Sequence, residues 1–178
     1  ILLSTVDVFS YPIDVYENTL INEIKLNPYG LNRRFFEKFV QNNFINHLII
    51  RLPALIGSGL KKNAIFDLHN KNQISKINNE SFFQFYPVNI LWRSIEIAIK
   101  SNLKIIHLNS EPISINEIAL KCFNITLKHE ENTLFQKYDM KSLYVKIFNK
   151  NDSFYHLSKD EIISNINDYI QNEPLKIF

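Results

Sequence analysis

The sequence predicts an α/β fold built on a parallel sheet, on the strength of three observations. A β-rich apolar run occupies residues 1–9, a helical pattern follows from residue 27, and a second apolar run covers residues 47–52. Strand, helix and strand in this order form a βαβ unit, whose two strands pair in parallel. The 178 residues are 46% hydrophobic and 21% charged, as expected of a globular chain with a sizeable core.

The first strand and the first helix have clear boundary signals. The strand shows no polar alternation before Ser4, which is typical of a strand covered on both faces. Asn27 is a favoured N-cap and Pro28 suits the first helical position, so the helix is expected to begin here and to run to about residue 43. Its apolar residues form two adjacent rows, Leu31, Phe35 and Phe39 in one and Phe36, Val40 and Phe44 in the other.

The elements after residue 62 are expected to be shorter. Ser114 and Ser158 each stand three positions before a glutamate, which is the spacing of a capping box and places a helix start at both serines. The other expected elements are helices over residues 63–69 and 88–100, strands over residues 82–85 and 105–108, and a last helix over residues 159–171.

Composition argues against several classes of partner. The 20 basic and 18 acidic residues are spread along the chain, so no nucleic-acid or membrane partner is expected. No apolar run approaches the roughly 20 residues that cross a bilayer. Cys122 is the only cysteine and cannot form an internal disulfide, which suits a reducing, cytoplasmic compartment. The five histidines lack the spacing of a zinc site, so no metal is expected.

Tyr29 and Arg33 are the strongest candidates for chemistry. They stand four positions apart on the expected helix and therefore share one face. A guanidinium beside the ring and the positive end of the helix both favour the phenolate, which suits proton transfer with a substrate hydroxyl. Thr5, at the end of the neighbouring strand, can hold the same substrate oxygen. Tyr155 and Lys159 have the same spacing, but a helix start at residue 158 separates them, so they should not share a helical face.

The segment Ser4-Thr5-Val6-Asp7-Val8-Phe9, followed about two dozen residues later by Tyr-x-x-x-Arg, resembles the extended short-chain dehydrogenase/reductase family. This family comprises NAD-dependent epimerases and dehydratases that act largely on nucleotide sugars. The resemblance implies the C-terminal part of a doubly wound, Rossmann-like parallel sheet and a small mixed α/β substrate-binding lobe. It assigns residues 1–60 to the C-terminal part of the NAD(P)-binding domain. Residues 61–178 are assigned to the substrate-binding lobe, together with strands and helices that return to the sheet.

The resemblance also implies roles for individual residues. Thr5 would supply the catalytic hydroxyl, Tyr29 would be the acid/base, and Arg33 would replace the lysine that binds the nicotinamide ribose. An arginine can hold ribose hydroxyls, but it is permanently charged and is not expected to relay a proton. The family's 4,6-dehydratases have an Asp-Glu pair after the threonine where this chain has Val6-Asp7, which favours epimerisation or simple oxidation and reduction. By the same resemblance Pro53 lies beside the nicotinamide ring, and the substrate contacts are Lys62, Asn63 and Tyr86.

Glycine is scarce, and this limits cofactor binding. Gly30, Gly57 and Gly59 are the only glycines, and none lies in the glycine-rich turn that cradles a pyrophosphate. Because the chain begins at Ile1 and not at a methionine, we expect it to start inside a domain and to be inactive alone.

The expected function is that of an NAD- or NADP-dependent epimerase or oxidoreductase acting on a sugar nucleotide or a similar hydroxyl-bearing substrate. The alternative is a catalytically silent protein of the same fold that binds a nucleotide or a partner. The resemblance further implies a homodimer, in which the phenylalanine-rich first helix contributes to the subunit contact.

Overall fold

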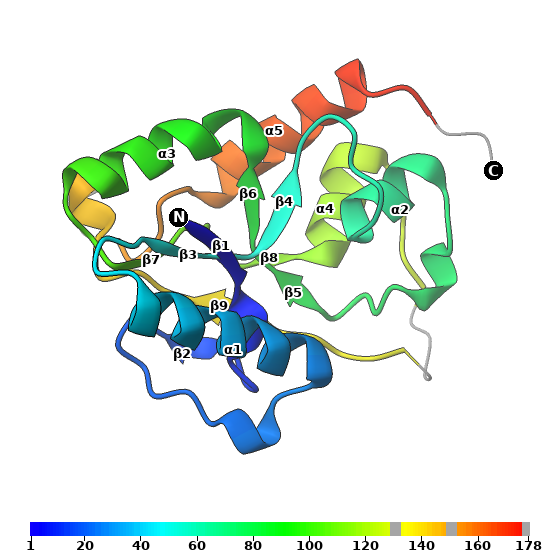
Figure 1. Cartoon of the computed structure of the whole chain (residues 1–178). Coiled ribbons are helices and arrows are strands. Elements are labelled where there is room, and N and C mark those ends of the chain that lie inside the picture. The colour runs from blue at the N-terminus through cyan, green and yellow to red at the C-terminus, as the bar shows by residue number, and fades with distance from the viewer. Residues whose placement is uncertain (129–132, 149–152, 176–178) are drawn as a thin grey trace.

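The structure is a computed structural model that describes residues 1–128, 133–148 and 153–175 (Figure 1). Its central element is a three-stranded parallel sheet in the order β1-β3-β7, and helix α1 connects β1 to β3. This confirms the predicted βαβ unit. Helix α1 lies on one side of the sheet and α3 on the other (Figure 1). The bounds are β1 Leu2–Thr5, α1 Pro28–Asn43, β3 Ile49–Leu52, α3 Val88–Lys100 and β7 Ile105–His107.

Three pairs of short strands surround this sheet. Strands β4 (Ala54–Ile56) and β6 (Phe85–Pro87) pair in parallel, and β5 (Phe82–Phe83) pairs antiparallel with β8 (Ile113–Ser114). The strand predicted over residues 82–85 is therefore split between two sheets. The third pair is parallel and joins β2 (Ile13–Val15) to β9 (Asp139–Met140).

The remaining helices begin close to their predicted starts. At α5 the Ser158 side chain and Glu161 form the predicted capping box. The corresponding prediction for Ser114 is wrong in one respect: α4 begins after this residue, but its side chain makes no capping hydrogen bond. Ser114 is the last residue of β8 and pairs with Phe82, so the sheet positions it there. The bounds are α2 Ala64–Asn70, α4 Ile115–Phe123, α5 Lys159–Asn172, and the 3-10 helices η1 Val6–Val8, η2 Glu23–Lys25, η3 Ile74–Lys76 and η4 Val145–Phe148.

The first strand is shorter than predicted because Thr5 ends it. The Thr5 hydroxyl accepts a hydrogen bond from the backbone N–H of Asp7 at 3.2 Å and so caps η1. At the start of α1, the Asn27 side chain accepts from the backbone N–H of Gly30 at 2.8 Å. A Cβ atom at Gly30 would collide with the backbone carbonyl oxygen of Asp7. Only glycine therefore allows α1 to approach the turn that follows β1 so closely.

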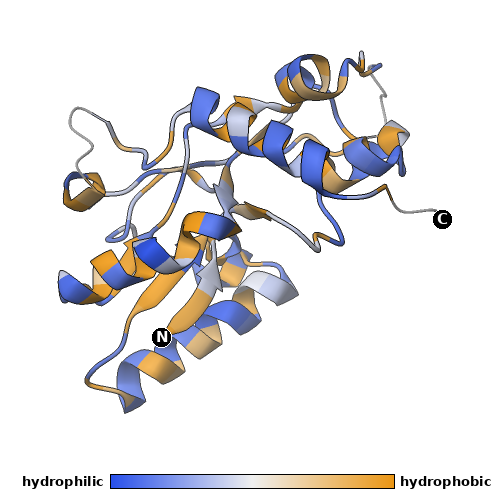
Figure 2. Ribbon diagram, turned by 90° about the horizontal axis from the view of Figure 1, so that it is seen from above, coloured by the Kyte–Doolittle hydropathy of each residue, from blue (hydrophilic) through white to orange (hydrophobic). Residues whose placement is uncertain are grey.

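Most of the core lies between the sheet and helices α2 to α5. Figure 2 shows the central strands as a hydrophobic band, with helices of mixed hydrophobic and hydrophilic residues around it. Cys122 is half-buried and packs against this core, as predicted for a small core residue, and burial raises the pKa of its thiol to about 11. No helix in the described part of the chain is both long and apolar enough to cross a membrane. The fully buried core residues include Ile50, Ile65, Ile106, Leu108, Ile113, Ile118, Ile162 and Ile166.

Helix α1 turns a charged residue, and not its aromatic rows, toward the sheet. Glu37 is fully buried, whereas Phe35, Phe36 and Phe39 remain between 49% and 65% exposed. The expected subunit contact through this helix stays a prediction, as does the domain boundary at residue 60. Because β7 pairs with β3, residues on both sides of that boundary build the central sheet.

Glu37 anchors α1 to two strands through a saturated set of hydrogen bonds. Its carboxylate accepts from Ser4 Oγ at 2.6 Å, from Arg51 Nε at 3.0 Å and from Arg51 Nη2 at 2.9 Å. Arg34 Nη1 donates to it at 3.0 Å. Burial acts to raise the pKa of Glu37, but the hydrogen bonds from Arg51, Ser4 and Arg34 and the charge of Arg51 outweigh it, so the pKa lies below its ordinary value.

The same polar row continues across the sheet to His107. Ser4 is in register with Arg51, and Arg51 is in register with His107. Arg51 Nη1 lies 3.2 Å from His107 Nε2, and His107 Nδ1 lies 2.8 Å from the carbonyl oxygen of Lys141. Arginine can only donate, so Nε2 must accept and Nδ1 must carry the proton. Burial and then the charge of Arg51 lower the pKa of His107 to about 3, so this histidine stays neutral.

We expect Glu37→Gln to lower the free energy of unfolding by about 3–5 kcal/mol, because it leaves the buried Arg51 without its counter-charge. Glu96→Gln, at an exposed position of α3, is the matched control and should change stability by less than about 0.5 kcal/mol. Urea unfolding of both variants tests this. Equal stability of Glu37→Gln and the parent protein would contradict it.

Acid should destabilise the fold through His107. Below about pH 6.5 the unfolded chain takes up a proton on this residue that the folded chain binds only near pH 3. The free energy of unfolding should therefore fall with decreasing pH across that window, by about 1.4 kcal/mol per pH unit from this group. Denaturant titrations at pH 7, 6 and 5 measure the slope, and His107→Gln should be less stable at pH 7 but have a shallower slope. The same slope in both proteins would rule out this origin.

Candidate functional site

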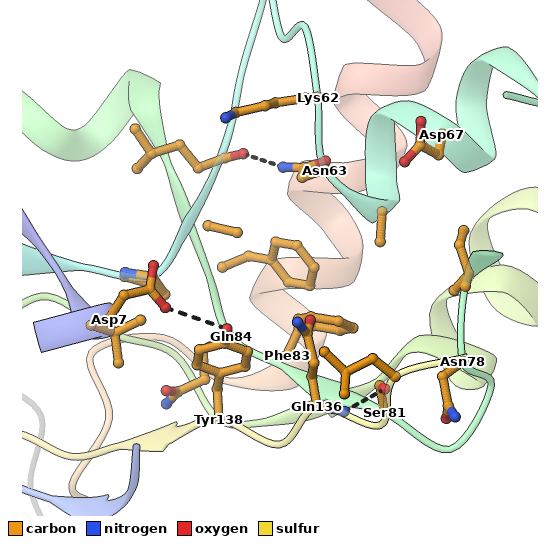
Figure 3. Close-up of a pocket in the computed structure, with 18 of the residues that line it drawn as sticks. Asp7, Lys62, Asn63, Asp67, Asn78, Ser81, Phe83, Gln84, Gln136 and Tyr138 are labelled. Atoms are coloured by element: carbon orange, nitrogen blue, oxygen red, sulfur yellow. Dashed lines mark hydrogen bonds between the residues drawn. The ribbon is translucent and has the colours of Figure 1, made fainter. Parts of the chain in front are cut away.

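A pocket of about 890 Å³ opens beside the carboxyl end of β1. Thr5 reaches it from the end of β1, Tyr29 from the start of α1 and Pro53 from the end of β3. Lys62 and Asn63 line it from the segment before α2 (Figure 3). In parallel α/β sheets, ligands bind outside the carboxyl ends of the strands, which is where this pocket lies.

Arg33 is placed against Tyr29, as the helical spacing predicts. Its guanidinium carbon lies 5.4 Å from the centre of the Tyr29 ring, within the range of a cation–π interaction. Tyr29 is 51% exposed, and Thr5 is only 8% exposed. Arg33 is not among the residues that line the pocket, and its contact with the site is the one with the Tyr29 ring.

Tyr86 is a correction, because the structure places it in the core and not in the pocket. Its side chain is 1% exposed, and its hydroxyl forms a hydrogen bond of 2.7 Å with Ser94 Oγ on α3. Burial raises the pKa of Tyr86 to about 12. The expected strand ended at residue 85, whereas β6 continues to Pro87 and carries Tyr86 into the packing against α3.

Asn63 lines the pocket, but its side chain is committed to the protein. Its oxygen accepts from the backbone N–H of Phe66 at 3.0 Å, and its amide group donates to the carbonyl oxygen of Leu55 at 3.0 Å. Its backbone has φ 133 and ψ 177, a region that costs of order 1–3 kcal/mol for residues other than glycine. The two hydrogen bonds hold this conformation, so Asn63 shapes the wall of the pocket.

A second set of lining residues was missed by sequence reasoning. Asp7 accepts a hydrogen bond from Thr5 Oγ1 at 3.0 Å. It accepts a second from the Tyr138 hydroxyl at 3.4 Å (Figure 3). The Tyr138 ring stacks on Phe83 with centroids 5.8 Å apart and an interplanar angle of 24°. Asp7 stands two positions after Thr5 and could have been found from that spacing. Tyr138 lies 131 positions further along, and no local pattern marks it.

The rim of the pocket carries an excess of positive charge. Lys61, Lys62 and Lys76 line it, together with the carboxyl groups of Asp7 and Asp67. Burial raises the pKa of Asp67 above its ordinary value. The rim therefore favours an anionic ligand.

Comparison with known proteins identifies the fold. No protein-family model and no curated protein matches the sequence. Solved structures do match. The chain aligns with the Bordetella bronchiseptica enzyme WbmG in complex with NAD at a TM-score of 0.72 and 10% identity, over 98% of this chain and 61% of that one.

Two further matches are enzymes of named activity. One is the UDP-N-acetylglucosamine 4-epimerase of Methanobrevibacter ruminantium in complex with UDP-N-acetylmuramic acid, at a TM-score of 0.68, 13% identity and 96% and 61% coverage of the two chains. The other is the dTDP-4-dehydrorhamnose reductase of Bacillus anthracis in complex with NADP. It aligns at a TM-score of 0.67 and 15% identity, over 96% of this chain and 64% of that one. The chain has the fold of these enzymes. It spans 61–64% of their length.

This epimerase and reductase fold confirms the predicted α/β architecture and the fold that the family resemblance implied. The predicted cofactor contacts are Tyr29, Arg33 and Pro53, and Thr5 is the predicted catalytic hydroxyl. The structure brings Thr5, Tyr29 and Pro53 to one pocket, whereas Arg33 does not line it. The described part of the chain holds no glycine-rich turn of the kind that cradles the pyrophosphate of a dinucleotide. Gly30 packs on Asp7, Gly57 on Val88, and neither belongs to a glycine-rich turn. The described residues offer candidates for contacts to the nicotinamide end of the cofactor, and their role in binding it stays a prediction.

Gly30→Ala should damage both stability and site geometry, because the added methyl group forces the start of α1 away from η1. We expect a loss of about 1–3 kcal/mol in the free energy of unfolding, although alanine is the better helix former by about 1 kcal/mol. Asn32→Ala, at an exposed position of the same helix, should not destabilise the protein. Denaturant unfolding of the two variants checks this, and a Gly30→Ala protein as stable as its parent would contradict the close contact.

Proposed function

We propose that this chain supplies the substrate-binding and proton-transfer groups of an NAD(P)-dependent epimerase or oxidoreductase acting on a sugar nucleotide or a similar hydroxyl-bearing substrate. One observation carries the proposal. Thr5 and Tyr29, from two different elements, line the same pocket, with the Arg33 guanidinium stacked on the tyrosine ring. This is the arrangement that proton exchange with a substrate hydroxyl requires.

In the proposed mechanism Tyr29 removes the proton from the substrate hydroxyl, and Thr5 holds the same oxygen. Arg33, whose guanidinium carbon lies 5.4 Å from the centre of the Tyr29 ring, positions that ring, and Pro53 would flank the ring of the cofactor. A nicotinamide cofactor, when bound, supplies the hydride acceptor for the substrate carbon. For the reverse reaction Tyr29 returns the proton.

The substrate class follows from the rest of the pocket. Its volume of about 890 Å³ is within the range of small-molecule sites, and the lysines of its rim suit the phosphates of a nucleotide. Among the structural neighbours, the M. ruminantium epimerase was solved with UDP-N-acetylmuramic acid, a sugar nucleotide. We place the sugar near Thr5 and Tyr29 and the phosphates near Lys62, so that the nucleoside extends toward Phe83.

The proposal extends to compartment and assembly. A half-buried single thiol suits a reducing compartment such as the cytoplasm. The exposed aromatic rows of α1 suit a homodimer contact.

A catalytically silent protein that binds a nucleotide or a partner is the second candidate, and Arg33 favours it. An arginine cannot relay protons as a lysine can, because it stays charged throughout the accessible pH range.

Tyr29→Phe separates the two candidates in the full-length protein that contains this chain, assayed with nicotinamide cofactor. We expect turnover of a sugar nucleotide to fall by about 10²–10⁴-fold, because the acid/base hydroxyl is lost. Tyr155→Phe is the matched control, since Tyr155 has the same spacing to a basic residue but hydrogen-bonds Asp139 outside the pocket. Turnover that survives Tyr29→Phe would exclude the proposed mechanism, and cofactor retention without turnover in the parent protein would favour the silent alternative.

A further inference from the structure

The Thr5 hydroxyl already has two hydrogen-bond partners, and both belong to Asp7. Thr5 Oγ1 donates to Asp7 Oδ2 at 3.0 Å and accepts from the backbone N–H of Asp7 at 3.2 Å. The chain turns into η1 directly after β1, which brings the carboxylate and the backbone N–H of Asp7 to the same hydroxyl.

The direction of the first bond is set by chemistry. An ionised carboxylate only accepts, so the shared proton belongs to Thr5. A hydroxyl has one proton and two lone pairs. Its proton is directed to Asp7 and one lone pair is used by the Asp7 N–H, so one lone pair of Thr5 remains for a ligand. Hydrogen bonds to a charged acceptor are roughly twice as strong as neutral ones, which makes this orientation costly to reverse.

Asp7 is itself held in place by a residue that is distant in sequence. The Tyr138 hydroxyl donates to the other carboxylate oxygen, Oδ1, at 3.4 Å (Figure 3). Burial, followed by the charge of Asp7, raises the pKa of Tyr138 to about 12, so this hydroxyl remains a donor at neutral pH. The stack of Tyr138 on Phe83 fixes its ring.

We propose that Asp7 sets Thr5 as a hydrogen-bond acceptor and thereby makes the site select the alcohol form of its substrate over the ketone form. The inference rests on the proposed function and adds a specificity-determining residue to it. A substrate hydroxyl can donate to the remaining lone pair of Thr5. A ketone oxygen has no proton, so Thr5 could bind it only by giving up its bond to Asp7.

This preference separates two activities that share the fold. An epimerase begins with an alcohol and an oxidised cofactor, whereas a reductase begins with a ketone and a reduced cofactor. The matched structures include both kinds of enzyme, so the fold does not decide between them. The Thr5–Asp7 pair assigns this site to the alcohol-binding kind.

The test compares the dissociation constants of UDP-6-deoxyglucose and UDP-4-keto-6-deoxyglucose, and of the dTDP-linked pair, by calorimetry on the full-length protein. The alcohol is titrated with reduced cofactor and the ketone with oxidised cofactor, so that neither reacts. The alcohol-to-ketone affinity ratio of each variant is divided by that of the parent protein, which cancels the cofactor difference. Asp7→Ala frees the Thr5 proton and should shift the ratio about tenfold toward the ketone.

Two further substitutions guard against loss of folding and against a general charge effect. Asp7→Asn retains a neutral acceptor of nearly the same shape and should shift the ratio in the same direction by less. Asp160→Asn, at an exposed position of α5, removes the same charge far from the pocket and should leave the ratio unchanged.

A Thr5→Val background decides whether Asp7 acts through Thr5. If it does, Asp7→Ala should no longer change the ratio once the hydroxyl is absent. A shift that persists in this background, or an unchanged ratio in Asp7→Ala itself, would overturn the inference while leaving the proposed function intact. If neither the UDP-linked pair nor the dTDP-linked pair binds, as alcohol or as ketone, the proposed function itself is contradicted.

Discussion

The buried Glu37–Arg51 ion pair is the interaction on which the position of the site depends. It joins α1 to β3, and the bond from Ser4 adds β1, so one carboxylate ties together every element of the βαβ unit. A buried charge is costly unless it is paired and fully hydrogen-bonded, which makes any other rotation of α1 about its axis unfavourable. Tyr29 stands two turns before Glu37 on the same helix. Its direction toward the end of β1 follows from the way Glu37 is held.

The close contact between Gly30 and Asp7 fixes the distance between the first turn of α1 and the segment after β1. The ion pair determines how α1 is rotated, and the glycine determines how near its first turn comes to the segment after β1. Thr5 lies between the two constraints, because it follows Ser4, which hydrogen-bonds Glu37, and itself hydrogen-bonds Asp7, which contacts Gly30. Thr5 ends the strand, caps η1 and offers its hydroxyl to the pocket, so local backbone geometry and the candidate chemistry share one side chain.

The pocket also joins parts of the chain that are far apart in sequence. Tyr138 precedes β9 and hydrogen-bonds Asp7, and its ring packs on Phe83 of β5. Phe83 packs on Tyr138, Tyr138 hydrogen-bonds Asp7, and Asp7 hydrogen-bonds Thr5. The position of Tyr138 therefore influences the orientation of the Thr5 hydroxyl. A single aspartate thus links the wall that would bind the substrate to the residue that would hold its reacting oxygen.

Patterns in the sequence determined the helices, the parallel pairing of β1 with β3, and the placement of Arg33 over Tyr29. The helix start and the arginine position depend on neighbours within a few residues: Asn27 caps α1 directly, and a four-residue helical spacing brings a side chain over the one before it. The parallel pairing follows from the order strand, helix, strand. Only the tertiary structure decided that α1 buries Glu37 and exposes its phenylalanines, that Tyr86 belongs to the core, and that Tyr138 completes the pocket. These features depend on contacts between residues distant in sequence, and neither periodicity nor propensity contains that information. The aromatic pattern of α1 shows an apolar face but not which face meets the sheet, because the energy of a paired buried charge appears only when its partner strand is in place.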